Sequence, residues 1–417
     1  MACPFSDWRW PGGWPCSAAD RTAYKTTKCR HRTGVDRTMD NTKRYERLRE
    51  RYLNGDLDRR KFLGLIGAAG LAYGVHTPFA KQALAATQEV RFDGWGGVVS
   101  EAFRKHAFGP YSDKTGIKVV DGTFGGGDEY LSRVKASQEG EYNIAHLSGV
   151  FDYARYSNLG LNSTLNEDNI PNLKYVIPKL VEVFRGVTDG KLSCVPYDYG
   201  TTGIAYNRKY ISDAEAKEKG AKLLTDAAYK GKIGGWSDWR TRVWYASLQT
   251  GQDPNGATDM DAVWDAVRTN RDLLLKYWQS GAELMSLLAE EEIYVTEGWS
   301  GRIYALQEQG HDIGYIDPPN GFGWQECLFV IKGSPMEACE ELLNFMLAPE
   351  TSIAVAEGQN YPPALDPTKV DLGSKIPTLP AFDPTGTLSG LTFANPEYWN
   401  SNEQAWAKTF GRIQKGY

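Results

Sequence analysis

Short apolar runs alternate with amphipathic stretches along the chain from about residue 90 onward. The runs predict three strands in the first part, at 90–95, 117–120 and 143–147. The amphipathic stretches predict helices over 100–107 and 129–137, with Asp128 as the N-cap of the second helix. Strands interleaved with helices of this length predict a parallel α/β sheet. Its glycine-rich turns, at the carboxyl ends of the strands, are the usual place for a ligand.

The second half repeats the alternation around two longer extended stretches, 195–207 and 313–321. Helices are predicted over 239–249 and 260–279, followed later by a strand at 327–332 and a helix over 335–347. The extended stretches are suited to crossing between two lobes. A fold with two crossings can close by a hinge over a cleft.

The two crossings would divide each lobe into separate segments of the chain. We expect lobe 1 to comprise 86–199 and 321–365, and lobe 2 to comprise 200–320 and 366–417. About 330 residues are more than one hydrophobic core usually holds, which also favours two lobes.

The chain before residue 86 has a different character. Arg59 and Arg60 precede a short apolar run diluted by glycine and alanine, and small residues stand at Ala83 and Ala85. This segment, 39–85, resembles a twin-arginine export signal with a cleavage site, which implies a periplasmic protein that begins near Ala86. The apolar run is well short of the roughly 20 residues that span a bilayer. Residues 1–38 have no periodic pattern and are interpreted as a mis-called extension.

Charge changes sign at the proposed cleavage site. Residues 1–85 hold 16 Lys and Arg against 8 Asp and Glu, a net charge of +8, whereas the whole chain has −5; the remainder therefore has about −13. Such an acidic surface argues against nucleic acid as a partner and favours cationic ligands or plain solubility.

Three cysteines follow the cleavage site, Cys194, Cys327 and Cys339. Their odd number excludes a complete disulfide framework. A Cys327–Cys339 pair and three buried free thiols both fit the sequence.

Several motifs in this order resemble the polyamine-binding (spermidine/putrescine) proteins of ABC importers, a group within the family 1 extracellular solute-binding proteins. The motifs are Gly94-Trp95, Thr115–Val119, Val195–Asn207, Gly298–Gly301, Gly323–Glu326, Leu342–Leu347 and Asn360–Pro363. The resemblance covers nearly all of the chain after the signal. It implies a type II periplasmic-binding-protein fold that acts as a monomer, binds a small amine without a cofactor and delivers it to a membrane permease.

The resemblance also implies a set of ligand-binding residues. Trp95, Trp299, Trp324 and Tyr361 match aromatic residues of the family's site, Asp238 and Glu326 match carboxylates that hold amine groups, and Ser148 matches a polar residue after the third strand. A protonated amine needs carboxylates for its charge and aromatic faces for its stem, each cation–π contact contributing roughly 0.5–2 kcal/mol. Each residue has a simpler alternative: the tryptophans could be core residues, and Asp238 and Ser148 could cap helices.

One position departs from the family's pattern. The second carboxylate of the family falls on Thr241, with Arg240 and Arg242 beside it. Either arginine could be a solvated surface charge. Alternatively, Arg242 could grip a ligand carboxylate, which would favour a zwitterionic or quaternary-ammonium ligand of the betaine or choline type. Asp198 could replace the missing acid.

Two other functional classes were considered. An exported enzyme would need a catalytic motif, and the segment most similar to a nucleophile elbow, Gly298-Trp299-Ser300-Gly301-Arg302, has arginine where the last glycine should be. Ferric-ion capture would need clustered Tyr and His ligands; Tyr197 and Tyr199 share a strand face but no histidine accompanies them. We therefore expect neither catalysis nor a bound metal.

Overall fold

The computed structural model describes residues 47, 50, 51, 61 and 89–416. All of the sheet lies in one compact unit, residues 81–417. The predicted extension over 1–38 and the predicted export signal over 39–85 fall outside the described residues, apart from those four isolated positions. No helix in the described part of the chain has the length and apolar character needed to span a membrane.

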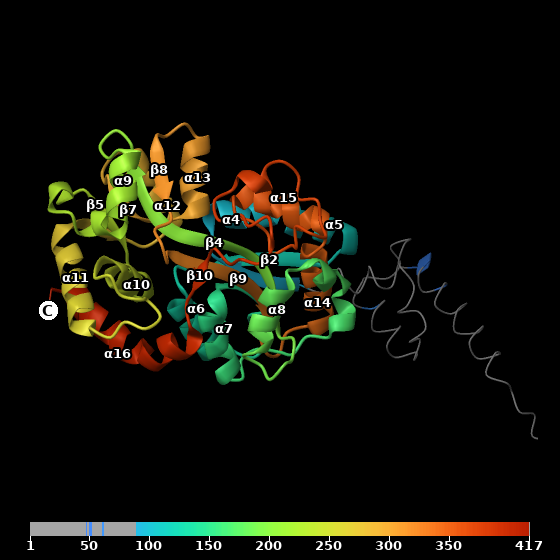
Figure 1. The fold of residues 1–417 in the computed structure, drawn as a ribbon. Helices are drawn as coiled ribbons and strands as arrows, with labels where there is room; N and C mark the ends of the chain where they lie inside the picture. The colour runs from blue at the N-terminus through green and yellow to red at the C-terminus, as the bar shows by residue number, and fades with distance from the viewer. Residues whose placement is uncertain (1–46, 48–49, 52–60, 62–88, 417) are drawn as a thin grey trace, which may run out of the picture. The chain divides into compact units, whose positions relative to one another are not determined.

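The strands form one mixed sheet that continues from one lobe into the other (Figure 1). Its order is β2-β1-β3-β9-β4-β7-β5-β6, with β8 paired to β4 and β10 paired to β9. The strands are β1 Glu89–Gly94, β2 Lys118–Thr123, β3 Ile144–Ser148, β4 Cys194–Asn207, β5 Ile233–Trp236, β6 Leu274–Trp278, β7 Val295–Trp299, β8 Ile313–Ile316, β9 Phe322–Val330 and β10 Thr392–Phe393.

Two antiparallel strands, β4 and β9, join the lobes. The first half of β4 pairs with β9, and its second half pairs with β7 and β8. Lobe 1 is built on the parallel strands β2, β1 and β3, and lobe 2 on the parallel strands β6, β5 and β7. This two-lobed α/β fold confirms the predicted fold class. The exact lobe boundaries stay a prediction.

Helices cover the sheet in both lobes (Figure 1). They are α4 Gly97–Phe103, α5 Gly109–Thr115, α6 Gly127–Ala136, α7 Gly149–Asn158, α8 Pro178–Arg185, α9 Asp213–Lys219, α10 Trp239–Gln249, α11 Met260–Leu273, α12 Gly281–Ala289, α13 Ser300–Glu308, α14 Met336–Met346, α15 Pro349–Gln359 and α16 Pro396–Gln414. A π-helical turn, Arg104–Phe108, joins α4 to α5.

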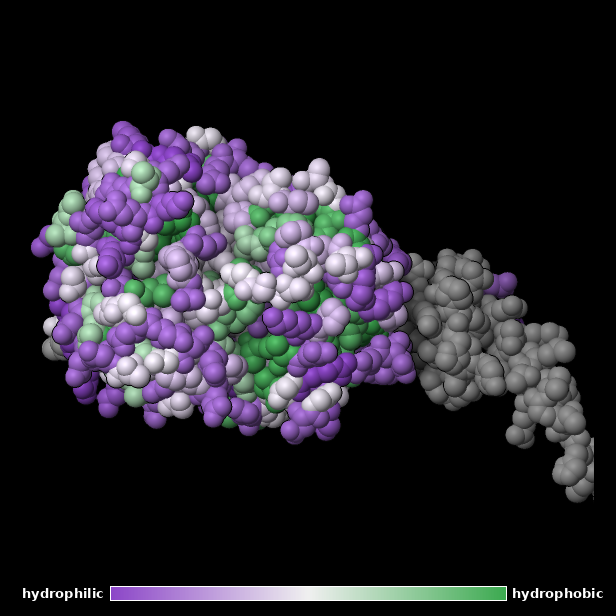
Figure 2. Space-filling model, viewed as in Figure 1, coloured by the Kyte–Doolittle hydropathy of each residue, from purple (hydrophilic) through white to green (hydrophobic). Residues whose placement is uncertain are grey.

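Separate hydrophobic cores hold the two lobes. In lobe 1, residues of α4, α14 and α15 pack with β1 and β9. In lobe 2, residues of α10, α11 and α16 pack with the end of β4. The outer rim of the face in Figure 2 is mostly hydrophilic, and its largest hydrophobic group lies near α8. Because each lobe has its own core, the lobes could move relative to one another without either core unfolding.

Three local predictions were wrong. The helix predicted over 260–279 ends at Leu273, because Leu274–Trp278 pairs with β5 as an edge strand. Asp128 is not an N-cap, since α6 begins at Gly127 with Gly126 as its N-cap. The second crossing is not 313–321, whose first residues pair with β4 inside lobe 2; the chain crosses in the first half of β9.

Candidate functional site

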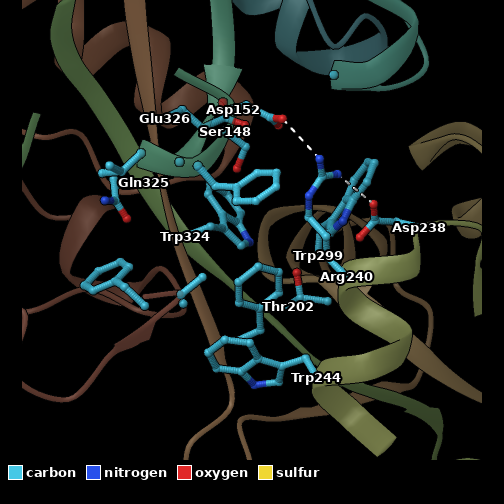
Figure 3. Close-up of a pocket in the computed structure, with 18 of the residues that line it drawn as sticks. Ser148, Asp152, Thr202, Asp238, Arg240, Trp244, Trp299, Trp324, Gln325 and Glu326 are labelled. Atoms are coloured by element: carbon cyan, nitrogen blue, oxygen red, sulfur yellow. Dashed lines mark hydrogen bonds and ion pairs between the residues drawn. The ribbon is translucent and has the colours of Figure 1, made fainter. Parts of the chain in front are cut away.

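A pocket opens between the lobes, and all seven residues predicted to bind a ligand line it. Its volume is about 1110 Å³ including the part open to solvent, and most of its lining is aromatic or aliphatic. Figure 3 shows side chains from both lobes directed into this space. The predicted residues in its lining are Trp95, Ser148, Asp238, Trp299, Trp324, Glu326 and Tyr361.

The topology explains why these residues meet. Trp95 follows the end of β1, Ser148 ends β3, Asp238 follows the end of β5, and Trp299 ends β7. These are the carboxyl ends of the parallel strands in both lobes, which is where open α/β sheets bind ligands. The strand ends of lobe 1 and those of lobe 2 both line the pocket, on opposite sides.

Aromatic rings form two pairs in the pocket. Trp95 of lobe 1 and Trp299 of lobe 2 have ring centroids 6.4 Å apart, and both rings are partly exposed. Trp324 and Tyr361 lie edge to face at 5.0 Å and are buried. The first pair can therefore hold a ligand between the lobes, whereas the second forms a fixed wall.

Glycines make room for these large side chains. A Cβ atom at Gly200 would come within 2.5 Å of the Trp324 ring, and one at Gly301 within 2.6 Å of the Tyr361 ring. A larger residue at either position would displace the wall of the pocket.

Glu326 is joined to a buried charged cluster. Its Oε2 lies 2.5 Å from Nε2 of His146, whose same nitrogen is 3.6 Å from Oδ2 of Asp198. Burial lowers the pKa of His146, but Glu326 and Asp198 outweigh it and raise the pKa to about 10. Burial raises the pKa of Glu326 to about 7, although protonated His146 opposes this rise. The cluster keeps an ionisable carboxyl in an apolar pocket.

Asp198 does not replace the missing acid in the pocket lining. It is fully buried, accepts a hydrogen bond from Gln359 at 2.6 Å, and acts as the second carboxylate beside His146. Asp198 and His146 therefore position Glu326 rather than contact a ligand.

A second charged cluster lies at the rim of the pocket and includes residues from both lobes. Arg240 donates to Asp238 at 3.1 Å, and its Nη2 lies 3.3 Å from Asp152 and 3.5 Å from Asp128 (Figure 3 draws the first two contacts). Its guanidinium also lies over the Phe151 ring, 4.4 Å from the centroid. These contacts join lobe 2 to α6 and α7 of lobe 1.

Asp238 combines two roles. It caps α10 by accepting a hydrogen bond from the amide of Thr241 at 2.9 Å, and it pairs with Arg240. Ser148 is the N-cap of α7, but its side chain makes no capping hydrogen bond. The capping alternative therefore applies to the side chain of Asp238, whereas the Ser148 hydroxyl makes no hydrogen bond with the described residues.

Arg242 was offered as a grip for a ligand carboxylate, and the structure does not support that role. Its side chain is buried, pairs with Glu297, donates to Asn270 at 2.9 Å, and is absent from the pocket lining. Neither Arg242 nor Arg240 is a solvated surface charge, because the carboxylates around each draw it inward.

Within the described part of the chain, His146, Asp198 and Glu326 are the group whose donor atoms could hold a metal, lying within 4.8 Å of one another. The raised pKa of His146 favours a protonated imidazole, and a protonated ring nitrogen cannot act as a metal ligand. Tyr197, Tyr199 and Tyr206 are buried in the hydrophobic cores. The three cysteines among the described residues, Cys194, Cys327 and Cys339, are buried free thiols, so the Cys327–Cys339 pair is not formed.

Comparison with known families identifies the chain. The family described as "Bacterial extracellular solute-binding protein" matches residues 106–384, more than half of the sequence. The chain belongs to this family. Placing the pocket of this solute-binding protein between two lobes agrees with closure over a ligand.

Several characterised relatives show low sequence identity to this chain over most of their own length. The chain is 24% identical over 338 residues to the gamma-aminobutyric acid-binding protein of Pseudomonas aeruginosa, covering 77% of this chain and 89% of that protein. It is 22% identical over 381 residues to the putrescine-binding periplasmic protein PotF of Escherichia coli, covering 84% and 98%. Among solved structures, the spermidine/putrescine transporter substrate-binding protein PotD of Streptococcus pneumoniae superposes with a TM-score of 0.62 at 19% identity, covering 79% and 100%.

Other pocket residues were not anticipated from the sequence. Trp236, Trp244 and Asp152 line the pocket, as does Arg302, which is 4% exposed. Arg302 had been noticed only for breaking the nucleophile-elbow pattern. Its place three residues after the end of β7, directly behind Trp299, was the signal that could have identified it.

Proposed function

We propose that this solute-binding protein captures a small protonated amine outside the cytoplasmic membrane and delivers it to the permease of an ABC importer. Polyamines are the leading candidates, because several similar proteins are named for putrescine or spermidine. Another is named for gamma-aminobutyric acid, which also carries an ammonium group on a short aliphatic chain. Binding is passive and reversible, with no covalent step.

The observation that carries the proposal is the pair of partly exposed tryptophans, Trp95 and Trp299, beside an ionisable carboxyl. Trp95 and Trp299 come from opposite lobes and can contact one ligand from both sides. Glu326 lines the same pocket and can accept hydrogen bonds from an ammonium group. A micromolar site needs about 8 kcal/mol in total, which a few cation–π contacts and one charge-assisted hydrogen bond, with burial of the methylene chain, can supply.

Ligand binding would be coupled to closure. Glu326 belongs to lobe 1 and Trp299 to lobe 2, so a ligand that contacts both stabilises the closed arrangement. Export by the twin-arginine route, processing near Ala86 and action as a monomer are parts of the same proposal. So are the lobe boundaries at 199/200, 320/321 and 365/366, and the absence of a nucleic-acid partner.

The test is isothermal titration calorimetry of the purified chain with putrescine and spermidine, and with betaine, choline and ferric ion as alternatives. We expect an amine to bind and its affinity to fall about tenfold or more in Glu326→Gln. The matched control is Glu397→Gln on the exposed surface of α16, which should leave the affinity unchanged. Binding of ferric ion alone, or of no compound, would contradict the proposal.

A further inference from the structure

Arg302 occupies an unusual position in the pocket. It is the third residue of α13, its side chain is only 4% exposed, and it lines the cavity behind Trp299. Its guanidinium carbon lies 5.8 Å from the ring centroids of both Trp299 and Tyr361. Gly281 leaves the space that this side chain fills, because a Cβ there would come within 2.6 Å of Nε. The fold thus holds a cation against two aromatic rings of the pocket.

The charge of Arg302 has no counter-ion. Among residues 89–416 it forms no ion pair, and its buried Nη1 has no hydrogen-bond partner. Glu326, whose pKa it influences, contacts His146 instead. The other two arginines of this region form ion pairs, Arg240 with three aspartates and Arg242 with Glu297, although each also has a buried nitrogen without a hydrogen-bond partner among the described residues.

The position of Arg302 in helix α13 makes its unpaired positive charge less favourable still. Its first turn contains Arg302 and no acidic residue, so a positive side chain lies at the positive end of the helix dipole. A buried charge without a partner is strongly unfavourable, and such charges in proteins are normally paired. A ligand anion would supply the partner that residues 89–416 do not provide.

We propose that Arg302 forms an anion-binding subsite that receives a carboxylate of the ligand. The inference rests on the proposed function, and it narrows the ligand class from small amines to amines that also carry a carboxylate, such as ω-amino acids. The ammonium group lies between Trp95 and Trp299 near Glu326, and the carboxylate accepts two hydrogen bonds from the planar guanidinium. Arg302 takes the role that the sequence had suggested for Arg242.

The experiment compares two series of ligands that differ only at one end. Linear ω-amino acids from β-alanine to 6-aminohexanoate are titrated against diamines with the same number of carbon atoms, using the wild-type chain, Arg302→Gln and Arg302→Lys. We expect the best amino acid to bind wild type at least tenfold more tightly than its matched diamine. Arg302→Gln should remove this preference and leave diamine binding unchanged or stronger. Arg302→Lys, which keeps the charge but loses the paired donors, should be intermediate.

Arg240→Gln is the matched control, since that arginine also lines the pocket but is already paired. It should weaken both series alike. If wild type binds diamines as tightly as amino acids and Arg302→Gln changes neither, the anion subsite is refuted while the capture of amines stands. If no compound of either series binds wild type, the proposed function itself fails.

Discussion

Two arginines line the same pocket in opposite electrostatic surroundings. Arg240 at the rim is surrounded by Asp128, Asp152 and Asp238, two of which belong to the other lobe. Arg302 lies deeper, among aromatic rings, with no carboxylate paired to it among the described residues. The rim arginine is thus paired within the protein, whereas the proposed partner of Arg302 is the carboxylate of a ligand.

The two arginines therefore act on different quantities. Arg240 affects the stability of the contact between the lobes, and Arg302 affects the affinity for a ligand. The contacts of Arg240 with Asp128 and Asp152 join the two lobes, so they stabilise this arrangement of the lobes whether or not a ligand is present. An unpaired buried charge does the reverse: it destabilises the empty closed pocket and is relieved by the right ligand.

The largest expected effect is at the rim. Arg240→Gln leaves buried Asp152 with Asp128 and Asp238 nearby and only Arg155 to offset them. Breaking a buried pair on one side costs about 3 kcal/mol. We expect the free energy of unfolding in urea to fall by about that amount, and small-angle X-ray scattering to show a more open molecule. A loss below about 1 kcal/mol would mean that the rim cluster behaves as a surface ion pair.

Replacing Trp299 tests whether its ring binds the amine in the pocket between the lobes. Trp299→Leu should weaken amine binding by about 2 kcal/mol, or roughly 30-fold, because the cation loses its ring in a desolvated site. Trp299→Tyr keeps a π face and should recover much of the affinity. Calorimetry with the best ligand measures both, and equal losses in the two variants would assign Trp299 to packing alone.

The next effect is the pH dependence of binding. The pKa of Glu326 is raised to about 7, so this carboxyl is neutral at low pH and charged at high pH. His146 remains protonated throughout this range, because its pKa is about 10. Amine affinity should therefore fall about tenfold between pH 8 and pH 6. Glu326→Gln should abolish the pH dependence, and its persistence in that variant would assign it to another group.

The smallest expected effect has the opposite sign to the first. Arg302→Gln removes an unpaired buried charge, so the ligand-free protein should gain about 1 kcal/mol in its free energy of unfolding. Urea denaturation without ligand measures this gain. A loss as large as that of Arg240→Gln would show that Arg302 has an unrecognised partner and that the two arginines do not differ.

Much of the fold and the site could be anticipated because both depend on local patterns. Trp95 and Ser148 lie at the ends of apolar runs that were predicted as strands, and the ends of parallel strands meet at one edge of a sheet. Trp299 was identified through the family resemblance alone. The errors arose where distant partners override local preference. Leu274–Trp278 continues a helical pattern, yet it becomes an edge strand because β5 offers it backbone hydrogen bonds.

Charges were the least predictable part of the site. Arg240, Arg242 and Arg302 all follow a tryptophan within a few residues, so the local sequence does not show which carboxylate, if any, each arginine contacts. Their partners, Asp152 and Glu297, are 88 and 55 residues away from the arginines they contact. Likewise, His146 and Glu326 meet only because β3 pairs with β9.

The pattern of residues along the chain was therefore sufficient for the α/β class and the two lobes, which follow from periodicity. Contiguous motifs that resemble a known family were sufficient for four aromatic residues of the pocket, but not for Trp236 and Trp244. Only folding decided which carboxylate each buried cation would meet. Ion pairing depends on distances of a few ångströms between segments that are far apart in the sequence. For a buried charge, the presence or absence of a partner changes the stability by several kcal/mol, about 3–5 when one partner of a buried pair is removed.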